Sequence, residues 1–159
     1  MKQDRTKTNA LRLLDRAGVE YQTHSYDADA CEDGVEVAAA IGAPTERVFK
    51  TLVTRARSGQ IYVFSIPVDA NLNLKRAAAL VSEKSLEMIH VRELLSTTGY
   101  IRGGCSPIGM KKRFPVAIDE TALQYERIFL SAGQRGLQME LRASDLASLI
   151  PLQFAALCD

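Results

Sequence analysis

The chain has 159 residues, 47% of them hydrophobic and 25% charged, and its formal net charge is +1. This length and composition fit one globular domain with a sizeable core. A net charge so close to zero argues against a protein that grips long stretches of nucleic acid unaided, because such binding depends on many phosphate contacts, but it still allows contact with one or two phosphates at a site.

Five elements are predicted in the first half of the chain, in the order helix 8–18, strand 21–26, helix 35–41, strand 47–55 and strand 61–68. Thr8 can cap the first helix, and Gly18 ends it. A looser acidic stretch, 27–33, precedes the second helix. Ser58 and Gly59 separate the two strands that follow, so we expect these strands to form a hairpin.

Six elements are predicted in the second half, in the order helix 74–81, helix 91–96, strand 116–118, strand 128–131, strand 137–141 and helix 145–150. Ser144 can cap the last helix, which Pro151 stops, and residues 134–136 form the turn between the last two strands. Helices and strands mix without regular βαβ alternation. This favours one compact domain over 1–159, of α/β or α+β class, built on a mixed, mainly antiparallel sheet.

The first seven residues are polar and no apolar segment follows them, so we expect neither a signal peptide nor a membrane span. The three cysteines, Cys31, Cys105 and Cys158, are widely spaced, which favours reduced thiols in the cytoplasm. There is no CxxC pair, and the only histidines are His24 and His90. We therefore expect no metal site.

The most informative stretch is 98–112, which holds four of the ten glycines and leads into a basic run, 111–113. Glycines allow a backbone to approach a ligand closely, and consecutive N–H groups can cradle an oxyanion or a phosphate. Composition alone leaves a flexible surface loop equally open. The stretch is not a nucleotide-binding P-loop, because Met110 stands where the lysine belongs and Pro107 interrupts it.

Cys105 could act as a nucleophile, since Arg102 and Lys111 nearby in the sequence would favour a thiolate. A cysteine hydrolase also needs a base, and neither histidine stands in a suggestive context. A small, half-buried cysteine usually only packs, and we favour that interpretation here.

Lys50 interrupts the apolar run 48–53. A lysine on an otherwise buried face either extends its charge to water at a strand end or lines a cavity, and this run alone slightly favours the first. The small residues 131–133, at the end of a predicted strand, leave a similar choice between ligand-facing N–H groups and a tight strand exit.

Four segments together resemble the YbaK/EbsC family of aminoacyl-tRNA deacylases, which is similar to the editing domain inserted in bacterial prolyl-tRNA synthetases. These segments are 48–53, 72–78, 98–112 and 131–136. Their order and spacing make the resemblance specific, and it extends from Thr8 to about Ile150. The glycine-rich stretch has the form of the EbsC-like branch.

The resemblance implies hydrolysis, in trans, of the ester that joins a wrong amino acid to the terminal adenosine of a tRNA, with Cys-tRNA(Pro) ranked first. It implies a YbaK-like mixed sheet or partial barrel surrounded by helices, with no metal and no cofactor. The expected partner is the tRNA acceptor end, and prolyl-tRNA synthetase is a candidate second partner. In this family the cysteine thiol of the substrate can attack its own carbonyl, which would explain a chain so poor in histidine.

The resemblance also assigns site residues. Lys50 matches the functional lysine of the family and is expected to be catalytic, holding the terminal phosphate or the oxyanion. The backbone amide of Gly104 or a neighbour could stabilise the oxyanion. The positions that match the substrate-binding pocket are Tyr26, Thr51, Gly103, Gly104, Cys105, Ser106, Pro107, Ile108, Gly109, Ser131, Ala132 and Gly133.

The chain departs from the YbaK branch at three positions. Asp33 stands where that branch usually has an aromatic residue, and Gln134 and Gln138 replace a lysine and an aspartate. Losing a surface ion pair is expected to matter little. A carboxylate in an aromatic position changes volume and polarity, so we expect an altered or relaxed substrate preference.

Two other function classes stay open at this point. One is a non-catalytic or regulatory module with the same fold that binds tRNA or a nucleotide. The other is a small-molecule hydrolase that depends on Cys105. Turnover of aminoacyl-tRNA would exclude the first, and sensitivity to thiol alkylation would support the second.

Overall fold

The computed structural model describes residues 7–159. Residues 1–6, on which the expectation about a leader segment depends, lie outside this range. Four α-helices are present among the described residues: α1 (Asn9–Ala17), α2 (Gly34–Ile41), α3 (Leu74–Leu80) and α4 (Val91–Thr98). Short 3₁₀ turns accompany them at Ala28–Ala30, Thr45–Arg47, Glu120–Gln124 and Ala143–Ser148.

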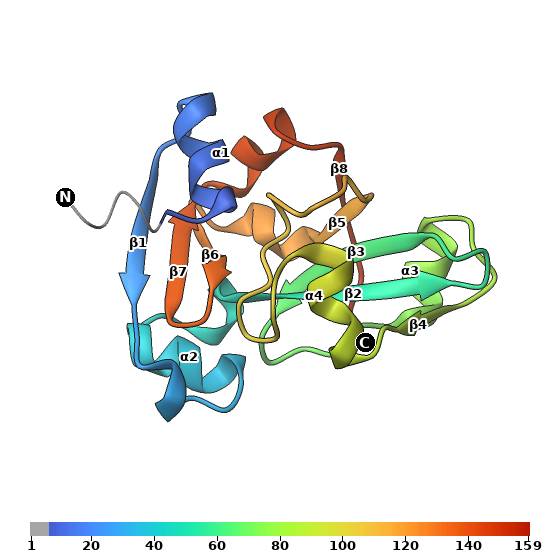
Figure 1. The fold of residues 1–159 in the computed structure, drawn as a ribbon, viewed down its shortest axis with the longest axis horizontal. Coiled ribbons are helices and arrows are strands. Elements are labelled where there is room, and N and C mark those ends of the chain that lie inside the picture. Colours follow the sequence, from blue (N-terminus) through green and yellow to red (C-terminus); the bar gives the residue numbers. More distant parts are fainter. Residues whose placement is uncertain (1–6) are drawn as a thin grey trace.

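The strands form two sheets (Figure 1). One is antiparallel, in the order β1 (Tyr21–Ser25), β7 (Leu137–Leu141) and β6 (Ile128–Gln134). The other runs in the order β4 (Leu86–Met88), β2 (Phe49–Ala56), β3 (Ile61–Pro67), β5 (Val116–Asp119) and β8 (Leu152–Ala155). Its β4–β2–β3 part is antiparallel and its β3–β5–β8 part is parallel. The expected mixed α/β class, mainly antiparallel, is confirmed, and the described residues form no closed barrel.

Local signals in the sequence explain several boundaries. The backbone N–H of Leu11 donates to Thr8 Oγ1 at 3.2 Å, and Gly18 ends α1 with a φ of 72°. Strands β2 and β3 pair as the predicted hairpin, with Gly59 in its turn at a φ of 93°. Glycine adopts this left-handed conformation at little cost, which is why it closes both elements.

The prediction of a last α-helix over 145–150 was wrong, because this element is a 3₁₀ helix. A 3₁₀ helix covers Ala143–Ser148, its first residue follows Arg142, and no side chain caps it. Ser144 therefore lies inside the element instead of capping it. The short strands β4 and β8 were not predicted, because each has only three or four residues and lies at a sheet edge, where a hydrophobic pattern is weakest.

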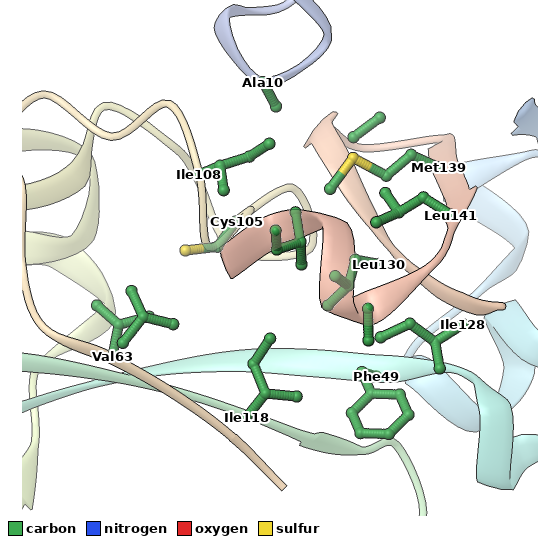
Figure 2. Close-up of a cluster of buried hydrophobic side chains, with 14 of the residues drawn as sticks. Ala10, Phe49, Val63, Cys105, Ile108, Ile118, Ile128, Leu130, Met139 and Leu141 are labelled. Carbon is green, nitrogen blue, oxygen red and sulfur yellow. The ribbon is translucent and has the colours of Figure 1, made fainter. Parts of the chain in front are cut away.

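The main hydrophobic core joins the two sheets. Figure 2 shows Met139 and Leu141 of β7 on one side of this cluster, with Cys105 and Ile108 of the glycine loop on the other. An isolated parallel bridge between Val48 and Phe129 also links the sheets. The glycine loop is thus held against the place where the sheets meet. In the described range, no helix has the length and apolar character that crossing a bilayer requires.

Candidate active site

A cavity of about 580 Å³ opens where several segments distant in the sequence converge. The beginning of β2, the segment that leads into α2, the glycine loop and the β6–β7 hairpin all contribute to its wall. Figure 1 shows α2 beside one end of the β1–β7–β6 sheet and the glycine loop near β2. Five of the residues predicted for the site line this cavity besides Lys50: Tyr26, Thr51, Gly103, Cys105 and Ser131.

Lys50 lines the cavity from strand β2. Its preceding neighbours, Val48 and Phe49, are 1% and 2% exposed, whereas Lys50 is half-buried. Among the described residues, no carboxylate forms an ion pair with Lys50. Thr51 beside it shares a 2.8 Å hydrogen bond with Ser65, hydroxyl to hydroxyl. The rigid strand therefore presents an uncommitted cation to the cavity.

The glycine loop divides into a part that faces the cavity and a part that anchors the loop. Arg102, Gly103 and Cys105 line the cavity, but Gly104 does not. The Gly104 N–H donates to the carbonyl of Ile101 at 2.9 Å. A Cβ on Gly104 would lie 2.9 Å from backbone atoms of the 134–135 turn, so this glycine allows two backbones to pack closely. Its amide is already used and is not free to bind an oxyanion as the sequence suggested.

The anchoring part comprises four residues that do not line the cavity: Ser106, Pro107, Ile108 and Gly109. The Tyr100 hydroxyl donates to the Ile108 carbonyl at 2.7 Å, and the Ile108 side chain is 1% exposed. A Cβ on Gly109 would lie 2.5 Å from the Tyr100 hydroxyl and 2.8 Å from the backbone nitrogen of Ala10. These residues fix the loop against helix α1 and do not form the wall of the cavity.

The small residues after β6 also serve two purposes. Ser131 is 8% exposed and lines the cavity, and its Oγ accepts from the Gly133 N–H at 3.1 Å. The β6–β7 register shifts between Ser131 and Gln134. Ala132 and Gly133 do not line the cavity; the Ala132 carbonyl accepts from the Thr8 hydroxyl, which caps α1. The bulge therefore ties this strand to α1, and only Ser131 reaches the cavity.

One wall comes from the segment 28–37, of which only Asp33 was expected from the sequence to lie at the pocket. Asp33 lines the cavity, and its Oδ1 accepts from the Glu36 N–H at 2.9 Å, which caps α2. A Cβ on Gly34 would lie 2.5 Å from Val68 Cγ1, so α2 can begin against the residue that follows β3 only because residue 34 has no side chain. The capping pattern was visible in the sequence, but nothing local placed this helix beside Lys50.

The β6–β7 turn supplies the remaining polar wall. Arg135 lines the cavity, and its Nη2 donates to the Ala28 carbonyl at 3.1 Å and lies 3.5 Å from Asp29 Oδ1. Gln138 also lines it and is 6% exposed, whereas Gln134 is exposed and lies outside it. The expectation that these two glutamines replace an ion pair on the surface is therefore wrong, because Gln138 belongs to the buried part of the cavity wall.

The surroundings of Cys105 do not favour a nucleophile. Burial raises the pKa of its thiol to about 12, although a hydrogen bond with Thr98 acts in the opposite direction. His24 lies 2.8 Å from Glu140 Oε1 through its Nε2, His90 is exposed, and neither lines the cavity. No group of three or more His, Cys, Asp or Glu side chains that could hold a metal ion occurs within residues 7–159.

Comparison with known proteins places this site in context. The family "Aminoacyl-tRNA editing domain" matches residues 28–149. The "Putative Cys-tRNA(Pro)/Cys-tRNA(Cys) deacylase EbsC" of Enterococcus faecalis is 43% identical over 97% of this chain and 94% of its own. A proline–tRNA ligase of Thermosipho africanus is 24% identical over 77% of this chain and 23% of the ligase.

Solved structures give the same assignment. One, described as the "crystal structure of a putative trans-editing enzyme for prolyl tRNA synthetase", has a TM-score of 0.83 and 26% identity, covering 95% of this chain and 97% of that protein. The expected resemblance is thereby confirmed. The segment 28–149 contains most of the cavity wall, including Lys50, the glycine loop and Gln138. This chain belongs to the aminoacyl-tRNA editing domain family.

Proposed function

We propose that the protein is an aminoacyl-tRNA deacylase that hydrolyses mischarged tRNA in trans, with Cys-tRNA(Pro) as its first-ranked substrate. The family, and the name of the relative that is 43% identical over nearly the whole chain, support this activity. The observation that carries the proposal is the position of Lys50, an uncommitted cation on a rigid strand at the wall of a cavity large enough for an aminoacyl-adenosine terminus.

Lys50 is the proposed catalytic residue. Attack on the ester carbonyl places negative charge on its oxygen, and a fixed ammonium group nearby stabilises that charge more than it stabilises the neutral ester. The same cation could instead hold the terminal phosphate. With the Gly104 amide used inside the loop, we assign any backbone contribution to Gly103 and Cys105, which line the cavity.

The nucleophile is proposed to come from the substrate. No histidine lines the cavity in the described chain, so the usual base for a serine or cysteine nucleophile is missing there. In Cys-tRNA the substrate thiol can attack its own carbonyl: the carbon–sulfur bond forms, the ester carbon–oxygen bond breaks, and the terminal hydroxyl leaves with the thiol proton. Water then opens the cyclic thioester to free cysteine. The protein contributes positioning and charge stabilisation.

The alternative of a Cys105-dependent hydrolase loses support, because burial raises the pKa of this thiol to about 12 and no histidine of the described residues lines the cavity beside it. Several finer points are part of the proposal. They are one editing domain over 1–159, a cytoplasmic location, and delivery of the tRNA acceptor end by a prolyl-tRNA synthetase. The similarity to a proline–tRNA ligase supports the last of these.

The test is single-turnover deacylation of proline tRNA charged with Cys, Ala or Pro, and of cysteine tRNA charged with Cys. We expect Lys50→Met to lower the rate by about 10²–10³, the usual effect of removing one group that stabilises an oxyanion. Lys84→Met, at an exposed lysine outside the cavity, is the matched control and should match the parent.

Two outcomes would contradict the proposal. If Lys50→Met melts at the parent temperature and hydrolyses at the parent rate, Lys50 has no catalytic role. If the parent protein binds the tRNA acceptor end but hydrolyses none of the four esters, the non-catalytic module is the better interpretation.

A further inference from the structure

The side chain of Gln138 is buried, and its amide oxygen has no hydrogen-bond partner among the described residues. The residue is 6% exposed, and no hydrogen-bond donor in the described part of the chain reaches its Oε1. Buried polar atoms in folded proteins nearly always have a partner, since an unpaired one loses its hydration without compensation. No partner within the described residues fixes this oxygen in place, so the terminal amide is free to turn it toward another donor.

Gln138 lies in the wall of the cavity that contains Lys50. It stands on β7 directly opposite Ser131 on β6, so the two side chains occupy the same face of the antiparallel pair. Val48, Phe49, Val68 and Cys105, each 8% exposed or less, also belong to the buried part of the wall. This part holds small polar and apolar groups and carries no carboxylate.

Most of the charged side chains of the wall lie in its exposed part. Its two carboxylates, Glu32 and Asp33, belong to exposed residues, as do the guanidinium groups of Arg102 and Arg135. An aminoacyl ester brings an α-ammonium group, and burying that group against a neutral amide with no carboxylate beside it would be costly. The ammonium thus fits the exposed part of the wall, which holds both carboxylates, whereas a neutral donor fits the buried part.

We propose that Gln138 is a specificity-determining residue whose side-chain carbonyl accepts a hydrogen bond from a hydroxyl or thiol on the amino-acid side chain of the bound ester. This inference rests on the proposed function. Rotation of the terminal amide turns its oxygen toward the cavity without moving the strand. The substrate class is then aminoacyl esters with small side chains that carry a neutral donor, as cysteine and serine do and alanine does not.

The cleanest comparison is serine with alanine on proline tRNA. Cysteine also supplies the nucleophile, so its rate reports two effects, whereas the serine and alanine esters both depend on slower direct attack by water and differ mainly in the hydroxyl group. A site that leaves its own buried acceptor unpaired discriminates against the ligand that lacks the donor. We expect the parent to prefer the serine ester over the alanine ester by about tenfold in kcat/KM, the effect of one such hydrogen bond.

The test uses Gln138→Met, which keeps the length and removes the acceptor. The serine-to-alanine ratio should fall to near one, and the melting temperature should not drop, because the variant also removes an unsatisfied buried oxygen. Gln138→Glu retains an acceptor oxygen and should retain the preference. Gln153→Met, at an exposed glutamine on β8 outside the cavity, is the matched control and should behave as the parent.

Two results would overturn the proposal while leaving the deacylase function intact. If Gln138→Met lowers both rates equally, the oxygen binds a group common to all substrates, such as the ammonium. If neither rate changes, Gln138 does not contact the substrate. Should Gln138→Met not fold, Gln138→Ala carries the same expectation for the serine-to-alanine ratio. Failure of the parent to hydrolyse any ester would instead refute the proposed function.

Discussion

Replacing Cys105 with serine should leave deacylation within about threefold of the parent, since a serine fills nearly the same buried space. Burial raises the pKa of the Cys105 thiol to about 12, so a nucleophilic role would depend on a thiolate that is rare at neutral pH. At pH 7 only about one molecule in 10⁵ would carry the thiolate, against a few per cent for an ordinary cysteine. Between pH 6 and 9 the rate should therefore depend on pH in the same way in Cys105→Ser as in the parent, because any rise there comes from the substrate thiol.

The assay combines single-turnover hydrolysis of Cys-tRNA(Pro) with alkylation by iodoacetamide, each modified cysteine being followed by mass spectrometry. A Cys31→Ser background removes the other cysteine of the cavity wall, so that alkylation near the substrate reports Cys105 alone. Cys105 should react slowly in the native protein and at an ordinary rate once urea unfolds it. A loss of more than a hundredfold in Cys105→Ser at an unchanged melting temperature, or alkylation of Cys105 in step with inactivation, would refute this reasoning.

Two further predictions concern the loop and the tRNA. Gly109→Ala should lower the free energy of unfolding by about 2–4 kcal/mol, because the φ of 78° strains any side chain and its Cβ would lie 2.5 Å from the Tyr100 hydroxyl. Gly59→Ala, with a φ of 93° but open space, should cost only about 1 kcal/mol in the same urea titration, and equal losses would contradict the packing argument. Binding of free tRNA should be weak, with a slope of log Kd against log salt of about 3 or less, since few basic residues lie near the cavity. A nanomolar Kd at physiological salt would count against this.

Short-range signals accounted for much of the fold. Helix α1 begins after Thr8 and ends at Gly18 as expected, and the β2–β3 hairpin turns at Gly59. These features are predictable because caps and tight turns depend on residues a few positions apart. The 3₁₀ helix at Ala143–Ser148 follows the same apolar spacing as an α-helix over so few residues. The edge strand β8 depends on pairing with β5, more than thirty residues earlier, which no local pattern reveals.

The candidate site was predictable in outline. The sequence identified the glycine loop as a unit, but it could not tell which of its N–H groups the fold already uses. Gly104 pairs inside the loop, while Gly103 and Cys105 line the cavity. This distinction depends on how the loop packs against the 134–136 turn and α1. Glycine content therefore indicates where backbones come close, and only the tertiary contacts decide whether a ligand or another strand occupies that space.

The two departures at the cavity wall differ in whether the fold itself explains them. The Asp33 carboxylate caps α2 through Glu36 N–H, and such a cap contributes about 1 kcal/mol to stability, so an acid at this position has a structural purpose even without a ligand. Gln138 has no such purpose, because its oxygen is buried and unpaired and lowers stability where it stands. A residue that weakens the folded chain while facing the cavity is the stronger candidate for substrate selection. Of the two substitutions, Gln138 is therefore the one through which we expect this protein to set its preference among aminoacyl esters.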